Sequence, residues 1–197
     1  MRMEFRRARQ SFWLLIGLVS ACASKPQIIK EPWSFAEKGI QLNLDADELL
    51  NVYDSERHTL LLCVYQLKDD RSYLSTLEGE GGLARLVSCQ SFGEDVVSAK
   101  RIIVNPAEIR DVSLDRGENV RFVAVVAGYL DATPEGSTRL YPIPTNTVEE
   151  GAVFSKQIHE RPGRLTQKLV LGSRAIEQTG ERIKVAQVTK RAPAPQP

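Results

Sequence analysis

The sequence predicts a mainly β protein, an antiparallel β-sandwich with a short helical insertion. Three observations support this fold class. Apolar Ile40, Leu42 and Leu44 alternate with polar residues, which predicts a strand with one buried face. Residues 59–67 and 121–130 are nearly continuous apolar runs, as expected for central strands covered on both faces. Turn-forming residues separate these segments at fairly regular spacing, which is typical of a sandwich.

The N-terminal 21 residues have the composition of a bacterial export signal. Four arginines stand against one glutamate in residues 1–9, and residues 12–19 form an apolar stretch. This stretch is shorter than the roughly 20 residues that a membrane-spanning helix needs. It leads into Val19-Ser20-Ala21-Cys22, which resembles the lipobox at which bacterial lipoproteins are cleaved and acylated. The alternatives are an ordinary signal peptide with a nearby cysteine and an uncleaved anchor.

Under the lipobox interpretation, residues 1–21 are removed and Cys22 carries diacylglycerol and an N-acyl lipid. No other cofactor is expected. Two or three acyl chains give stable attachment, because a single chain anchors a protein only reversibly. Ala23 follows the modified cysteine where many inner-membrane lipoproteins of enteric bacteria carry aspartate, so the outer membrane is favoured. Residues 22–35, with two prolines, are expected to form a spacer before a domain over residues 36–188.

A long loop over residues 47–58 follows the first predicted strand. A tight hairpin needs only two to five residues, whereas this loop has twelve. Its apolar residues lie among charges, which suggests either a protein contact or a cap that folds down over one end of the sandwich. Under the first hypothesis the partner-binding residues are Leu49, Leu50, Asn51, Val52, Tyr53 and Glu56.

Residues 70–90 predict the helical insertion. Asp70 can cap a helix over residues 73–77, and residues 83–87 can form a second short helix after the glycine-rich joint at 79–82. Cys63 and Cys89 remain once Cys22 is assigned to lipid. In an oxidising compartment they can form a disulfide, or they can pack as two buried free thiols.

Further strands are predicted at residues 99–104, 109–114, 138–143, 165–171 and 182–188. Residues 189–197 include prolines at every second position near the end of the sequence, which predicts an extended, disordered tail.

Charge and motif content exclude several functions. Removing residues 1–21 takes away four of 26 basic and one of 25 acidic residues, which leaves a net charge near −2 and no indication of nucleic-acid binding. The two histidines, His58 and His159, are far apart and have no metal-ligand spacing. No nucleophile elbow or phosphate-binding loop is present. We therefore expect no metal site, no small-molecule substrate and no enzymatic activity.

The order of these segments resembles a known family. After the lipobox come Ile-x-Leu-Asn-Leu at residues 40–44, the long loop, Val-Tyr-Gln-Leu-Lys at 64–68 and the helical insertion. Ile-Ile-Val-Asn-Pro at 102–106 and Val-Ala-Val-Val-Ala-Gly-Tyr at 123–129 follow. In order and spacing, about residues 12–143 are similar to the outer-membrane lipoprotein of the type VI secretion apparatus, the TssJ, VasD or SciN family.

The resemblance implies a transthyretin-like β-sandwich, anchored in the outer membrane and facing the periplasm. It also implies binding to the periplasmic domain of the inner-membrane protein TssM, with residues 47–58 as a contact. The chain departs from the family at Pro106-Ala107, where Pro-Gly is frequent. Residues 145–197 extend beyond the usual domain, as an extra hairpin or a lineage-specific contact. The alternative function is an envelope lipoprotein that binds carbohydrate or peptidoglycan, although such a site wants an aromatic platform and Trp33 lies in the spacer.

Overall fold

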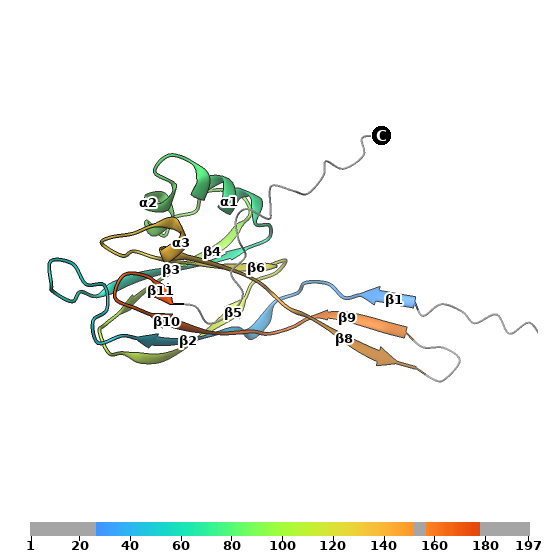
Figure 1. The fold of residues 1–197 in the computed structure, drawn as a ribbon. Coiled ribbons are helices and arrows are strands. Elements are labelled where there is room, and N and C mark those ends of the chain that lie inside the picture. Colours follow the sequence, from blue (N-terminus) through green and yellow to red (C-terminus); the bar gives the residue numbers. More distant parts are fainter. Residues whose placement is uncertain (1–26, 152–156, 178–197) are drawn as a thin grey trace, which may run out of the picture.

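The computed structural model describes residues 27–151 and 157–177 (Figure 1). Two four-stranded sheets pack face to face around a common core, and a smaller third sheet projects from one end of them (Figure 1). The export signal, Cys22, the predicted strand at 182–188 and the tail at 189–197 lie outside the described residues.

The first sheet has the strand order β11-β10-β2-β5. These strands span Ile176–Glu177 (β11), Leu165–Leu171 (β10), Ala36–Ala46 (β2) and Ile109–Arg116 (β5). The second sheet has the order β4-β3-β6-β7. Its strands span Val96–Val104 (β4), Leu60–Leu67 (β3), Phe122–Ala127 (β6) and Thr138–Pro142 (β7). The mainly β, antiparallel sandwich prediction is confirmed, although β10 runs parallel to β2.

Central strand β3 is buried on both faces, as its continuous apolar sequence predicts. Leu60, Leu62 and Val64 point into the core between the two sheets, together with Ile40 and Leu42 from β2. On the opposite face of the second sheet, alternate β3 residues pack in a separate apolar cluster with the helical insertion. Because a strand alternates its side chains, one sheet can serve two cores.

The helical insertion consists of α1 (Arg71–Glu78) and α2 (Gly82–Val87), which cover the outer face of the second sheet (Figure 1). The prediction that the Asp70 side chain caps the first helix is wrong by one residue. Asp70 is at the N-cap position, but its side chain makes no capping hydrogen bond. Instead, Asp69 Oδ1 accepts a hydrogen bond from Arg71 N at 2.9 Å. Gly82 is required at the joint, because a Cβ there would lie 1.9 Å from the Thr76 carbonyl oxygen.

The turn between β4 and β5 forms without the glycine that is frequent in the family. Glu108 N donates to the Asn105 carbonyl at 3.2 Å, and Ala107 adopts a φ of 60°. An alanine therefore occupies a left-handed position that suits glycine better.

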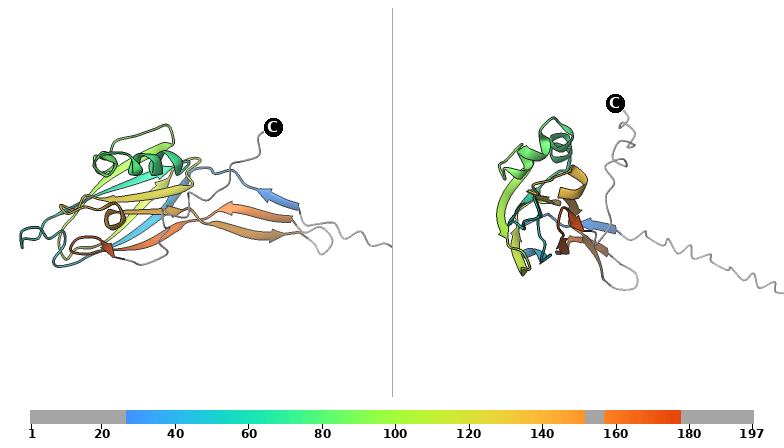
Figure 2. Two further views of the ribbon diagram at one scale, coloured as in Figure 1. Left: turned by 45° about the horizontal axis from the view of Figure 1, so that its top comes forward. Right: turned by 60° about the vertical axis from the view of Figure 1, so that its left-hand side comes forward.

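The third sheet, which we call the stem, has the order β1-β9-β8 and points away from the sandwich (Figures 1 and 2). Its strands span Gln27–Lys30 (β1), Gln157–Pro162 (β9) and Thr145–Glu150 (β8). Residues 27–30, part of the expected spacer, thus form a strand, and residues 145–150 and 157–162 contribute an antiparallel pair of strands. Because β1 pairs parallel to β9 and each strand leads into the first sheet, β2 and β10 also run parallel. A short helix, α3 (Pro134–Ser137), precedes β7.

Candidate functional site

The loop over residues 47–58 protrudes from the end of the sandwich opposite the stem (Figures 1 and 2). Its tip is a miniature hairpin, in which Tyr53 N donates to Glu56 O at 2.9 Å and Glu56 N donates to Tyr53 O at 3.0 Å. Asp54 and Ser55 between them have φ values of 51° and 66°. Two successive positive φ angles are those of a type I′ turn, in which polar residues such as aspartate are favoured. The tip therefore has a defined backbone conformation.

The base of the loop is tied to neighbouring turns by backbone hydrogen bonds. Asp47 N donates to the Leu171 carbonyl at 2.9 Å, and Val52 N donates to the Ser173 carbonyl at 2.8 Å. Ala107 N donates to the Asp47 carbonyl at 3.1 Å. These contacts join the loop to the β10–β11 and β4–β5 turns, so it is supported from both sides.

Two of the six predicted contact residues are buried, which corrects the prediction for them. Leu50 is fully buried in the core between the sheets, and Asn51 is only 3% exposed. The Asn51 amide donates to the Thr59 carbonyl at 2.9 Å and accepts from Leu130 N at 2.9 Å. Both residues hold the loop in place and cannot form a surface contact. The alternative in which the loop caps the sandwich therefore holds for Leu50 and Asn51, and the protein-contact hypothesis concerns only the exposed residues of the loop.

The exposed part of the loop carries large apolar side chains. Leu49 is 60% exposed and Tyr53 is 54% exposed, while Val52 is half-buried and Glu56 is exposed. Leu130, 54% exposed, belongs to the same end of the sandwich because its amide binds the loop at Asn51. We call Leu49, Tyr53 and Leu130 the loop surface. The sequence did not reveal the role of Leu130, because it continues the apolar run that was predicted to be a strand.

The exposed charged side chains of the loop are mostly acidic, and we call them the acidic rim. Asp47, Glu48, Asp54 and Glu56 are exposed in the loop, against one exposed arginine, Arg57. An apolar centre with a charged rim is the usual arrangement of a protein-binding surface. This arrangement favours a partner whose surface is apolar at the centre and basic around it.

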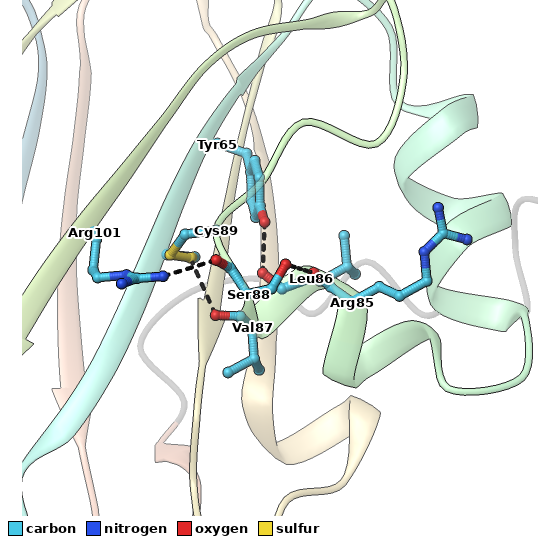
Figure 3. Close-up of a disulfide and its surroundings, with 8 residues drawn as sticks. Tyr65, Arg85, Leu86, Val87, Ser88, Cys89 and Arg101 are labelled. Atoms are coloured by element: carbon cyan, nitrogen blue, oxygen red, sulfur yellow. Dashed lines mark hydrogen bonds between the residues drawn. A yellow bond between two sulfur atoms is a disulfide. The ribbon is translucent and has the colours of Figure 1, made fainter.

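Cys63 and Cys89 form a disulfide that connects β3 to the end of the helical insertion (Figure 3). Their Cα atoms are 5.4 Å apart, within the usual range for a disulfide. Beside it, Tyr65 Oη donates to the Leu86 carbonyl at 2.5 Å and Arg101 donates to the Ser88 carbonyl at 2.9 Å (Figure 3). Of the two alternatives from the sequence, the structure therefore contains the bridge, with hydrogen bonds that hold the same segment.

A cavity of about 610 Å³ lies between the helical insertion and residues 128–134. Its lining is mostly glycine and apolar side chains, including Leu77, Leu83 and Val87. Tyr129 is the one ionisable residue in this lining, and burial raises the pKa of its phenol. The cavity thus offers no acid–base pair at neutral pH.

Residues 27–151 and 157–177 contain neither a candidate metal site nor a candidate membrane-spanning helix. No group of three or more His, Cys, Asp or Glu side chains there could hold a metal ion. In the same residues, no helix is long and apolar enough to cross a membrane. Trp33, the tryptophan that a carbohydrate platform would use, is half-buried, and the guanidinium groups of Arg116 and Arg121 lie 5.5 and 5.2 Å from its ring centroid.

The sequence over residues 38–169 matches the family model described as "Type VI secretion lipoprotein, VasD, EvfM, TssJ". The chain belongs to this family. The match continues to residue 169 and so spans β8 and β9, which the sequence predicted to lie beyond the usual domain. The family is one of secretion lipoproteins and is not defined by an enzymatic activity. No curated protein matches the sequence.

Solved structures of type VI secretion lipoproteins have the same fold. The lipoprotein TssJ1 from Pseudomonas aeruginosa aligns with a TM-score of 0.53 at 19% identity, over 78% of this chain and 100% of that one. Lip from Serratia marcescens, a membrane bound component of the Type VI Secretion System, aligns with a TM-score of 0.54 at 17% identity, over 76% of this chain and 99% of that one. At this identity the likeness establishes the fold alone.

Proposed function

We propose that this type VI secretion lipoprotein is a lipid-anchored assembly component of the secretion membrane complex and catalyses no reaction. In this proposal, Cys22 holds the chain at the outer membrane, the domain faces the periplasm, and the loop surface binds the periplasmic domain of a TssM-like inner-membrane protein. The observation that supports it best is the position of the loop, at the end of the sandwich opposite the stem (Figures 1 and 2). A protein that bridges two membranes needs its anchor and its partner site at opposite ends.

The exposed loop side chains are suited to binding a protein. Burying a leucine stabilises a complex by about 1.5–3 kcal/mol, and tyrosine is among the residues that most often dominate binding energy. Leu49 and Tyr53 are largely exposed on a loop whose backbone is held by hydrogen bonds. Because the loop is already ordered, binding costs less conformational entropy than it would for a flexible segment.

The acidic rim predicts how binding depends on salt. The loop has four exposed carboxylates against one exposed arginine. If a basic partner surface meets this rim, the association rate falls as ionic strength rises, because screening shortens the range of attraction. The dissociation rate depends mainly on the apolar contacts and changes less.

The partner site is tested with a soluble protein that lacks residues 1–21 and carries Cys22→Ser. Its affinity for the purified TssM periplasmic domain is measured by calorimetry, with and without Leu49→Asp and Tyr53→Asp together. We expect at least a tenfold loss of affinity with an unchanged melting temperature. Ile103→Asp is the matched control, because Ile103 is 50% exposed on β4 and outside the loop. Wild-type affinity in the folded double variant would refute the assignment.

The anchor is tested separately in cells. We expect the full-length wild type in the outer-membrane fraction, with lipid on Cys22 detected by mass spectrometry. Cys22→Ser is expected to leave that fraction and to abolish secretion while the protein still binds TssM in solution. Normal secretion by a soluble Cys22→Ser protein would show that anchoring is not required.

A further inference from the structure

The stem is connected through the chain to both sheets of the sandwich. Strands β1 and β9 lead into β2 and β10 of the first sheet, and β8 follows β7 of the second sheet. The parallel pairing of β1 with β9 is therefore continued, after short connections, by the parallel pairing of β2 with β10. Three chain connections, over residues 31–35, 143–144 and 163–164, join the stem to the sandwich.

Charged side chains tie the three stem strands together. The Glu31 carboxylate, just after β1, accepts from Arg161 Nε of β9 at 2.6 Å. The same guanidinium donates to Glu150 of β8 at 2.9 Å. His159 Nδ1 lies 3.4 Å from the Glu31 carboxylate, and Glu31 N donates to the Glu160 carbonyl at 3.0 Å. The end of β1 is thus held to β9 by backbone and side-chain bonds, and β9 is held to β8 through Arg161.

A buried arginine holds the junction between stem and sandwich. Arg116, at the end of β5, is 3% exposed. Its guanidinium donates to the carbonyl of Ser34 at 2.8 Å and to that of Gly163 at 3.3 Å, and it lies 5.5 Å from the Trp33 ring centroid. Gly163 N donates in turn to the Pro144 carbonyl at 2.7 Å. One side chain therefore bonds two of the three connections directly and reaches the third through Gly163.

We propose that the stem is a rigid spacer between the lipidated cysteine and the sandwich, and that it orients the loop surface away from the membrane. Arg116 is the residue that positions the stem relative to the sandwich. The inference rests on the proposed function for the lipid on Cys22. Cys22 and Gln27 are five residue steps apart and can lie at most about 18 Å from each other, whereas the 14 steps from Cys22 to Ala36 would reach about 50 Å as a free chain. Pairing β1 in the stem therefore confines the region that the loop surface can explore, which raises its effective concentration near a partner.

The first test asks whether β1 is paired in solution. Hydrogen exchange of the Ile29 and Glu31 amides, the alternate amides of this edge segment that face β9, is measured in the soluble Cys22→Ser protein, alone and with Glu31→Lys, which places a lysine beside Arg161 and His159. We expect protection in the parent protein and at least tenfold faster exchange in Glu31→Lys. Glu37→Lys is the matched control, because Glu37 makes the same charge change at an exposed site outside the cluster. Exchange of the Ile29 and Glu31 amides at random-coil rates in the parent protein would overturn the proposal.

The second test measures position at a membrane. The lipidated protein is placed in phosphatidylethanolamine–phosphatidylglycerol vesicles with a fluorophore at Ser55→Cys, and energy transfer to a dye at the bilayer surface gives the distribution of heights. We expect a narrow distribution for the parent protein and a wider one for Glu31→Lys at unchanged melting temperature. Arg116→Met should also widen the distribution, with a lower melting temperature because two carbonyl groups lose their donor. Equal widths in parent and Glu31→Lys would overturn the proposal. If Arg116→Met does not fold, Glu31→Lys alone decides.

Different experimental results would contradict the proposed partner site and the proposed role of the stem. Glu31→Lys is expected to bind TssM in solution with the parent affinity, because the stem is remote from the loop surface. Loss of TssM binding by the loop variants therefore bears on the partner site alone. A lack of lipid on Cys22 would remove the anchor while leaving the hydrogen-exchange result intact.

Discussion

Removing the disulfide between Cys63 and Cys89 should cost a defined amount of stability. The bridge closes a loop of 26 residues, which contains both helices of the insertion. The chain-entropy relation for a loop of this length gives about 3.5 kcal/mol at 25 °C. The double variant Cys63→Ala, Cys89→Ala is therefore expected to lose about that much free energy of unfolding. Cys89→Ala alone should lose nearly the same amount, because one cysteine cannot form the bridge.

Urea unfolding of the soluble protein measures this loss. For a typical urea dependence of about 1–3 kcal/mol per molar, the midpoint should fall by roughly 1–3.5 M. The wild type treated with a reducing agent serves as a second comparison and should fall by a similar amount. A loss below about 1 kcal/mol, with the disulfide confirmed by mass spectrometry in the wild type, would refute the reasoning, since the insertion would then be held by apolar packing and hydrogen bonds alone.

Three further predictions follow from burial, backbone conformation and charge. Leu50→Ala should cost about 2–5 kcal/mol in urea unfolding because Leu50 is fully buried, whereas Leu49→Ala should change stability by less than about 0.5 kcal/mol; equal effects would contradict the division of the loop. Ala107→Gly should raise the unfolding free energy by up to about 1 kcal/mol, because the left-handed strain of alanine exceeds the added unfolded-state entropy of glycine; a lower melting temperature would contradict this. The hydrogen bond from Arg161 lowers the pKa of the Glu31 carboxyl group below its ordinary 4.5. The stabilisation that ionised Glu31 gives the folded protein is therefore present above pH 4.5 and is lost as the pH falls through the lowered pKa. NMR shifts of β1 that change above pH 5 would contradict this.

The sandwich strands could be predicted because burial leaves a periodic pattern in the sequence. Alternation at residues 40–44 located β2, and the double-sided burial of β3 and β6 appears as continuous apolar runs. The stem strands leave no such pattern. All six residues of β8 are exposed and β1 is mostly exposed, so neither strand has an apolar face. They are held by charged side chains and by a buried arginine that comes from β5, and these contacts are not visible in local sequence.

The candidate site could be predicted only in outline. The length of the loop and its mixture of apolar and charged residues indicated an interaction segment. Leu49 and Leu50 are adjacent and identical in type, yet one is exposed and the other fully buried. Only the tertiary fold decides which of two identical neighbours points inward, and the same is true of Leu130, which the Asn51 side chain brings to the loop.

The position of β2 has a mechanical consequence. In sequence, β1, β2 and the loop follow one another, so under the proposed function the anchor and the partner pull on opposite ends of one continuous stretch. That tension runs along β2, which is hydrogen-bonded to β10 on one side and to β5 on the other. A pull parallel to a strand loads its hydrogen bonds in shear, so that they must break together, whereas a perpendicular pull would open them one by one. Under the proposed function, the chain is therefore arranged to resist extension along the line that joins the two membranes.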